Sequence, residues 1–174
     1  MAAAWALARL GLSALFLGEF ARAIPVLAES LHASLALGDR WGATWSQHLL
    51  VSAHQVSGEY EPGEMERLER ECVKVWREFG ARRDLAYSLQ NLVDCCLDAG
   101  RLEEAASLDR EALSIFLQIG DMFGVLSSVC IGAIVTAARG HPEPALRLYA
   151  AVEALREAAG ATTEPAFEAY FERR

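Results

Sequence analysis

The sequence predicts an all-α fold built as an array of about four helix-turn-helix units. Apolar residues recur at i, i+3 and i+4 along most of the chain, and strand-like alternation is nowhere sustained. Two interleaved series of glycines share a period of about 41 positions. One phrase also occurs twice: LALGDRWG at 35–42 returns as LQIGDMFG at 117–124, 82 positions and therefore two periods later.

The glycines are expected to end helices. Each follows a long amphipathic run and can adopt the left-handed conformation that closes a helix C-terminus. The first series is Gly38, Gly80, Gly120 and Gly160, at intervals of 42, 40 and 40, and the second is Gly18, Gly58, Gly100 and Gly140, at intervals of 40, 42 and 40.

Each unit is expected to contain two helices joined at a glycine of the second series. Asp39 and Asp121 follow the other glycines and should cap the next helix, while Trp41 and Phe123 should pack at its entry. The predicted helices are 2–17, 21–37, 41–57, 62–79, 83–99, 102–119, 122–139 and 143–159. Together, residues 1–174 form one repeat domain with units at 1–39, 40–81, 82–121 and 122–161, followed by the start of a further helix at 164–174.

Composition excludes several classes of function. The formal charge of −8 repels a phosphate backbone, and no Lys/Arg stripe offsets it, so we expect no nucleic-acid binding. The segment 1–18 lacks a basic leader and carries Arg9 inside the apolar stretch, so it is predicted to form a helix of the folded protein. The apolar segment 122–138 is too short to span a membrane.

The four cysteines are predicted to be free core thiols. Cys72, Cys95, Cys96 and Cys130 fit neither a zinc pattern nor a disulfide framework, which indicates a reducing cytoplasm.

The turns between paired helices resemble those of tetratricopeptide (TPR) repeats. The motif Gly-x-aromatic-x-x-Ala occurs at 18–23, with looser forms at 58–63 and 100–105, and Leu10-Gly11 matches the Leu-Gly pair of the repeat's first helix. The resemblance implies a right-handed α-α superhelix (solenoid) whose concave face is lined by the first helix of each unit. The period of about 41 exceeds the usual 34, and the proline that closes the second helix is missing.

A narrower resemblance concerns RLYAAVEALREAAGATTEPAFEAYFER at 147–173 together with the LGD-type turns. These are similar to the C-terminal helical repeats of LuxR-type and AfsR-like bacterial regulators, which are signal-transducing ATPases. The resemblance implies an arm that senses an effector or holds a partner, as a piece of a larger regulator. Neither a P-loop nor a basic DNA-reading helix occurs, so ATPase activity and DNA binding do not carry over.

Charge separates the two helices of a unit. The predicted first helices at 41–57 and 122–138 contain no Asp, Glu, Lys or Arg, whereas the second helix after Gly58 is densely charged and is expected to be solvated throughout, Glu69 included. The resemblance places eight candidate binding residues on the first-helix face: Trp45, His48, Ser52, Gln55, Tyr87, Gln90, Asn91 and Asp94. They could hold an extended peptide or a partner helix, although Trp45 and Tyr87 could equally be core.

Catalytic chemistry is not predicted. His48 and His54 are six positions apart and do not share a helix face, and Cys95 and Cys96 have no neighbouring base in the sequence. We expect no catalytic residue, no cofactor and no metal. The leading hypothesis is therefore a non-catalytic interaction module. The alternatives are a small-molecule sensor with a pocket between the uncharged first helices, and a scaffold that self-associates through its end units, possible as a homodimer.

Overall fold

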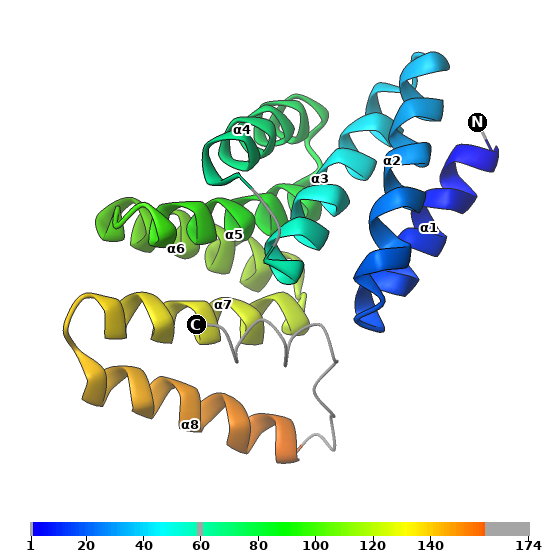
Figure 1. Cartoon of the computed structure of the whole chain (residues 1–174). Helices are drawn as coiled ribbons and strands as arrows, with labels where there is room; N and C mark the ends of the chain where they lie inside the picture. The colour runs from blue at the N-terminus through cyan, green and yellow to red at the C-terminus, as the bar shows by residue number, and fades with distance from the viewer. Residues whose placement is uncertain (1, 59–60, 159–174) are drawn as a thin grey trace. The chain divides into compact units, whose positions relative to one another are not determined.

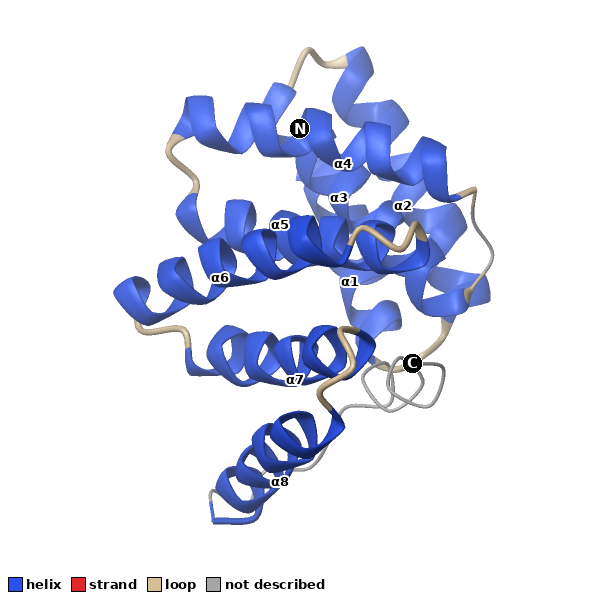
Figure 2. Ribbon diagram, turned by 90° about the vertical axis from the view of Figure 1, so that its left-hand side faces the viewer, coloured by secondary structure: helices blue, strands red, loops and turns tan. Residues whose placement is uncertain are grey.

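The computed structural model describes residues 2–58 and 61–158, and these residues form α-helices joined by short turns (Figure 1). No strand occurs in this described part (Figure 2), so the all-α prediction is confirmed, and every predicted helix boundary lies within one residue of the structure. The predicted roles of Tyr60, Gly160 and 164–174 lie outside the described residues. The helices are α1 (Ala2–Phe16), α2 (Phe20–Ala36), α3 (Arg40–Ser57), α4 (Pro62–Phe79), α5 (Arg82–Asp98), α6 (Leu102–Ile119), α7 (Met122–Ala138) and α8 (Pro142–Ala158).

The predicted helix stops are confirmed by the backbone. Seven glycines of the two series adopt positive φ, between 66° and 85°, and none of the described residues other than glycine does so. This left-handed conformation is costly for residues with a Cβ atom, which explains why glycine recurs at each joint. The seven are Gly18, Gly38, Gly58, Gly80, Gly100, Gly120 and Gly140.

The chain divides within α4 into two compact parts, an N-terminal part up to Val75 and a C-terminal part from Trp76. In the N-terminal part, α1, α2 and α3 pack around a core that includes Leu27 and Leu49. Gly11 lets α2 approach α1, because a Cβ atom at this position would lie 2.5 Å from Cγ of Leu27. In the C-terminal part, α5, α6 and α7 share a second core of Val93, Cys96, Ala105, Ile131 and Val135.

The last glycine of the repeated phrase is required by close packing. Gly124 lies in the first turn of α7 against the ring of Phe116, and a Cβ atom there would overlap that ring. Phe116 is fully buried, so its ring has little room to move. At the equivalent position in α3, a Cβ atom on Gly42 would lie 2.6 Å from Oδ2 of Asp39.

We predict that Gly124→Ala lowers the free energy of unfolding by about 1–3 kcal/mol, because the added methyl group overpacks the contact with Phe116. Urea denaturation followed by circular dichroism measures the change. Gly63→Ala is the matched control, since Gly63 has nothing within 4 Å of an added Cβ atom. A loss of stability for Gly63→Ala equal to that for Gly124→Ala would contradict the packing explanation.

Candidate functional site

The two aspartates of the repeated phrase cap the helices that follow them, as predicted. Oδ1 of Asp39 accepts a hydrogen bond from the backbone N–H of Gly42 at 2.9 Å, and Oδ1 of Asp121 accepts one from the N–H of Gly124 at 3.0 Å. Each bond satisfies an N–H that has no partner within its helix. A capping aspartate of this kind contributes about 1 kcal/mol.

The second oxygen of each aspartate binds the first helix of the unit that the aspartate ends. Oδ2 of Asp39 accepts from Nε1 of Trp5 at 3.0 Å. Oδ2 of Asp121 accepts from Nε of Arg83 at 2.8 Å and from the hydroxyl of Tyr87 at 3.3 Å. Trp5 and Tyr87 are separated by the same number of positions as the two aspartates, so an equivalent hydrogen bond from an aromatic side chain to the aspartate occurs in both parts of the chain. Neither Trp5 nor Arg83 was among the sequence-predicted site residues, although this shared spacing was a signal for Trp5.

The predicted aromatic residues are half-buried and held by specific contacts. Trp45 stacks on Trp5 with ring centroids 5.3 Å apart and an interplanar angle of 27°. Tyr87 meets the ring of Phe116 edge-on at 4.8 Å, and the Arg83 guanidinium lies 5.7 Å from the Tyr87 ring centroid. Burial, with a further contribution from Asp121, raises the pKa of Tyr87 to about 12, so its hydroxyl remains a hydrogen-bond donor at neutral pH. The Trp45 and Tyr87 rings are therefore fixed by their neighbours and partly accessible.

The remaining predicted site residues are less accessible. His48, Gln55, Gln90 and Asp94 are buried, whereas Ser52 and Asn91 are half-buried. The Ser52 hydroxyl donates to the carbonyl of His48 at 3.1 Å, within its own helix. Among these candidates, the accessible surface of α3 therefore comes mainly from Trp45 and Ser52. The accessible surface of α5 comes mainly from Tyr87 and Asn91.

Glu69 corrects the expectation that α4 is solvated on all of its charged positions. Its side chain is fully buried, and Oε1 lies 2.8 Å from Nδ1 of His48 in α3. Oε2 has no hydrogen-bond partner among the described residues. Glu66 and Glu71 follow the expectation, because each pairs with an arginine near the surface of α4. One carboxyl of the charge-rich helix α4 therefore belongs to the interior.

A second buried carboxyl belongs to a polar chain that joins three helices of the C-terminal part. Nε2 of Gln90 in α5 donates to Oγ of Ser128 in α7 at 2.9 Å, and Ser128 in turn hydrogen-bonds Asp109 in α6. A Cβ atom on Gly132 would lie 3.0 Å from Oδ2 of Asp109, while Oδ1 has no partner among the described residues. Burial raises the pKa of Asp109 to about 7, against a smaller lowering by Ser128.

These two carboxyls occupy the same position in successive repeats. Glu69 and Asp109 lie equally far ahead of their helix-ending glycines, Gly80 and Gly120. The same position in α2 is Leu27, which is fully buried. The position is thus an interior one that accepts an apolar or an ionisable side chain.

The cysteines are buried free thiols, as predicted. Burial, with a smaller contribution from Glu69, raises the pKa of Cys72, and burial raises the pKa of Cys130 to about 11, so both stay protonated at neutral pH. Within 2–58 and 61–158, no three His, Cys, Asp or Glu side chains are placed to hold a metal ion. None of the described helices is long and apolar enough to cross a membrane.

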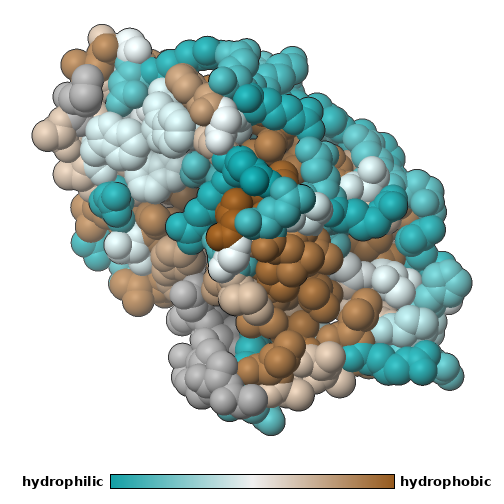
Figure 3. Space-filling view, turned by 180° about the vertical axis from the view of Figure 1, so that it is seen from behind, coloured by the Kyte–Doolittle hydropathy of each residue, from teal (hydrophilic) through white to brown (hydrophobic). Residues whose placement is uncertain are grey.

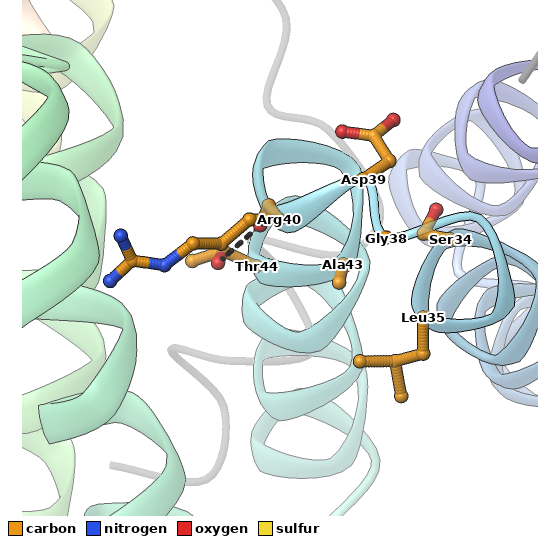
Figure 4. Close-up of a pocket in the computed structure, with 7 residues that line it drawn as sticks. All are labelled: Ser34, Leu35, Gly38, Asp39, Arg40, Ala43 and Thr44. Atoms are coloured by element: carbon orange, nitrogen blue, oxygen red, sulfur yellow. Dashed lines mark hydrogen bonds between the residues drawn. The ribbon is translucent and has the colours of Figure 1, made fainter.

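A shallow pocket of about 270 Å³ lies at the corner between α2 and α3. Figure 4 shows Ser34, Leu35 and Gly38 facing the first turns of α3, with the Arg40 side chain extending away from α2. This corner is part of the repeated phrase and is lined by the end of a second helix. It differs from the pocket between first helices that the small-molecule hypothesis expects, and that hypothesis stays a prediction.

Comparison with known proteins identifies the fold. No protein-family model and no curated protein sequence matches the chain. The solved structures similar to it include a Podosopora anserina kinesin light chain-like protein with nearly identical TPR-like repeats and a single-substitution variant of that protein. Each has a TM-score of 0.64 and 18% identity, over 92% of this chain and 78% of the other. The fold is therefore a TPR-like helical repeat.

We predict that Asp109→Asn makes stability less dependent on pH. Because the pKa of Asp109 is about 7 in the folded chain and about 4 in an unfolded one, the wild type loses stability as pH rises between these values. The variant removes this loss and should gain about 1–3 kcal/mol relative to the wild type on going from pH 5 to pH 8. Urea denaturation at both pH values measures the gain.

Asp98→Asn, which removes an exposed carboxylate from α5, controls for the loss of one negative charge. An equal pH response in the Asp109 and Asp98 variants would contradict the assignment to the buried carboxyl.

We predict that Glu69→Ala costs about 3–5 kcal/mol, because it leaves His48 buried without its carboxylate partner. The double variant His48→Ala/Glu69→Leu installs the residues that the first unit carries at the same positions, Ala8 and Leu27. It should be at least about 2 kcal/mol more stable than Glu69→Ala, since it removes both members of the buried pair and not one. Thermal and urea denaturation compare the variants, and a double variant no more stable than Glu69→Ala would contradict this explanation.

Proposed function

We propose that this chain is a non-catalytic protein-interaction module that binds a peptide or a partner protein on the first-helix face of its units. TPR-like repeats generally mediate protein-protein interaction, which supports the class of function. The observation that carries the proposal for this chain is the half-buried ring and polar side chain that α3 and α5 each present, with Trp45 and Tyr87 held in place by neighbouring side chains. Such a surface loses little conformational freedom when a ligand binds.

The chemistry of this face favours a ligand that is not strongly charged. Within α3, only the first residue, Arg40, is charged, apart from its histidines, and the accessible candidates are an aromatic ring and a hydroxyl. On α5, the accessible candidates are a ring and an amide, and the exposed Arg83 beside the ring is paired with Asp121. Aromatic rings are enriched at binding surfaces. An extended peptide with apolar side chains and free backbone amides matches such a surface.

We further propose that residues 1–174 act as one repeat domain, with units 1–39, 40–81, 82–121 and 122–161 and a further helix from 164, as the arm of a bacterial regulator in the cytoplasm. The regulator assignment is supported by the sequence resemblance of 147–173 and of the LGD-type turns to LuxR-type and AfsR-like proteins. The role in binding is supported independently by the fold and by the rings that α3 and α5 each carry.

We predict that each peptide selected from a random display library on the full wild-type chain binds either Trp45→Ala or Tyr87→Ala at least about tenfold more weakly, the usual loss when a central aromatic contact is removed. Fluorescence anisotropy with a labelled selected peptide measures the affinities, and circular dichroism verifies folding. Glu71→Gln on the exposed face of α4 is the control and should bind like the wild type. Wild-type affinity in both aromatic variants would contradict the proposal that the first-helix face binds the peptide.

A further inference from the structure

Asp109 places a buried carboxyl at the contact between α6 and α7. One of its oxygens, Oδ1, has no hydrogen-bond partner among the described residues. The other, Oδ2, would lie 3.0 Å from a Cβ atom on Gly132, so the carboxyl packs closely against α7 at this glycine. The side-chain hydrogen bond of Asp109 goes to Ser128, which also belongs to α7. These two contacts both join the carboxyl to α7.

The helices that pack on α6 bury no cation that could balance an ionised Asp109 within the described part of the chain. Helix α7 contains no Asp, Glu, Lys or Arg, and Figure 3 shows apolar surface in the region of α7 and α8. The buried titratable side chains of the packed helices are Asp94, Cys95 and Cys96 in α5 and Cys130 in α7. Acids and thiols cannot supply a positive charge.

The arginines of the neighbouring helices are held by other side chains. Arg77 at the end of α4 pairs with Glu111, Arg82 hydrogen-bonds Gln118, and Arg83 pairs with Asp121. All three arginines are more than half exposed or lie in an exposed first turn. Ionisation of Asp109 therefore creates a buried charge without a counter-ion, which is strongly unfavourable while α7 stays packed.

The N-terminal part has the same contact without a titratable group. Leu27 in α2 takes the position of Asp109, and Ser46 in α3 takes that of Ser128. Leu27 is fully buried, and the hydroxyls of Ser46 and Ser30 hydrogen-bond each other at 2.8 Å. Ionisation can therefore weaken this contact in the C-terminal part and leave the equivalent contact between α2 and α3 unchanged.

We propose that Asp109 makes the contact between α6 and α7 sensitive to pH: protonated Asp109 keeps α7 packed on α6, and its ionisation lets α7 separate while the N-terminal part stays folded. Burial raises the pKa of Asp109 to about 7, whereas a carboxyl released into water titrates at about 4. Opening therefore becomes more frequent as pH rises between these two values and changes little above the higher one. Such local opening is an ordinary property of folded proteins.

The opening would also change the support of the α5 face. Tyr87 and Arg83 both donate to Asp121, the residue that caps α7. Gln90 donates to Ser128 within α7. Separation of α7 removes the acceptors of all three side chains. The proposal does not rest on peptide binding, because it concerns a contact inside the protein that exists without a ligand.

Hydrogen-deuterium exchange of the full chain tests the proposal, with mass spectrometry between pH 5 and pH 8 and correction for the intrinsic effect of pH on exchange. In the wild type, the opening constant of the protected α7 amides should rise about tenfold per pH unit up to about pH 7 and then level off. Asp109→Asn should abolish this rise in α6 and α7. Amides of α1 and α2 should exchange alike in the wild type and the variant.

Glu111→Gln is the matched control, since it removes an accessible carboxylate from the same helix and should keep the wild-type rise. Asp109→Leu, which installs the residue that α2 has at this position, is a second variant that should abolish the rise. Three outcomes would overturn the proposal: a wild-type α7 whose opening does not change with pH, an Asp109→Asn variant that keeps the rise, or an equally large effect of that substitution in α1 and α2.

Discussion

The structure depends on an aspartate that uses both of its oxygens at the joint between two units. At Asp39 and Asp121, one oxygen caps the helix that starts the new unit, and the other accepts a hydrogen bond from the first helix of the previous unit. The two bonds fix the direction of the new helix and its distance from the old one. Gly42 is needed for this geometry, because a Cβ atom there would collide with the second oxygen of Asp39.

This arrangement explains why the repeated phrase returns after two units and not after one. At the joint between them, the position of the aspartate is taken by Ala81, which has no side-chain cap. There the indole N–H of Trp76 donates to the hydroxyl of Ser88 at 3.0 Å. Aspartate joints and this different joint alternate along the chain, although the pair of helices repeats in every unit. The phrase thus marks one type of joint and not a catalytic loop.

The fixed joints also determine what the first helices can offer to a partner. Trp45 and Tyr87 are oriented by groups that belong to the joints, Trp5 in one case and Asp121 in the other. A substitution at a joint would therefore alter the orientation of the rings on the candidate binding face, even though the substituted residue does not contact the ligand. Under the proposed function, binding and stability would be coupled through these few side chains.

Much of the fold could be predicted from the sequence, because glycines with positive φ and capping aspartates act within a few residues of themselves. The buried carboxyls could not be predicted in the same way. Glu69 was assigned to a solvated face from the charge density around it, yet it shares a stripe with Cys72 and Trp76 at helical spacing, and both of these are buried. That spacing was a signal for its burial. Its partner His48 depends on how α3 and α4 are rotated, which only the packed structure defines.

A double-mutant cycle between Trp5→Phe and Asp39→Ser tests the central role of the joint most directly. Serine can keep the cap on α3 but has no second oxygen for the Trp5 indole, and phenylalanine removes the indole N–H. If the aspartate joins the two units, the losses in free energy of unfolding of the two single variants should add up to about 0.5–1.5 kcal/mol more than the loss in the double variant. Strict additivity would show that the two residues act independently and would contradict this account.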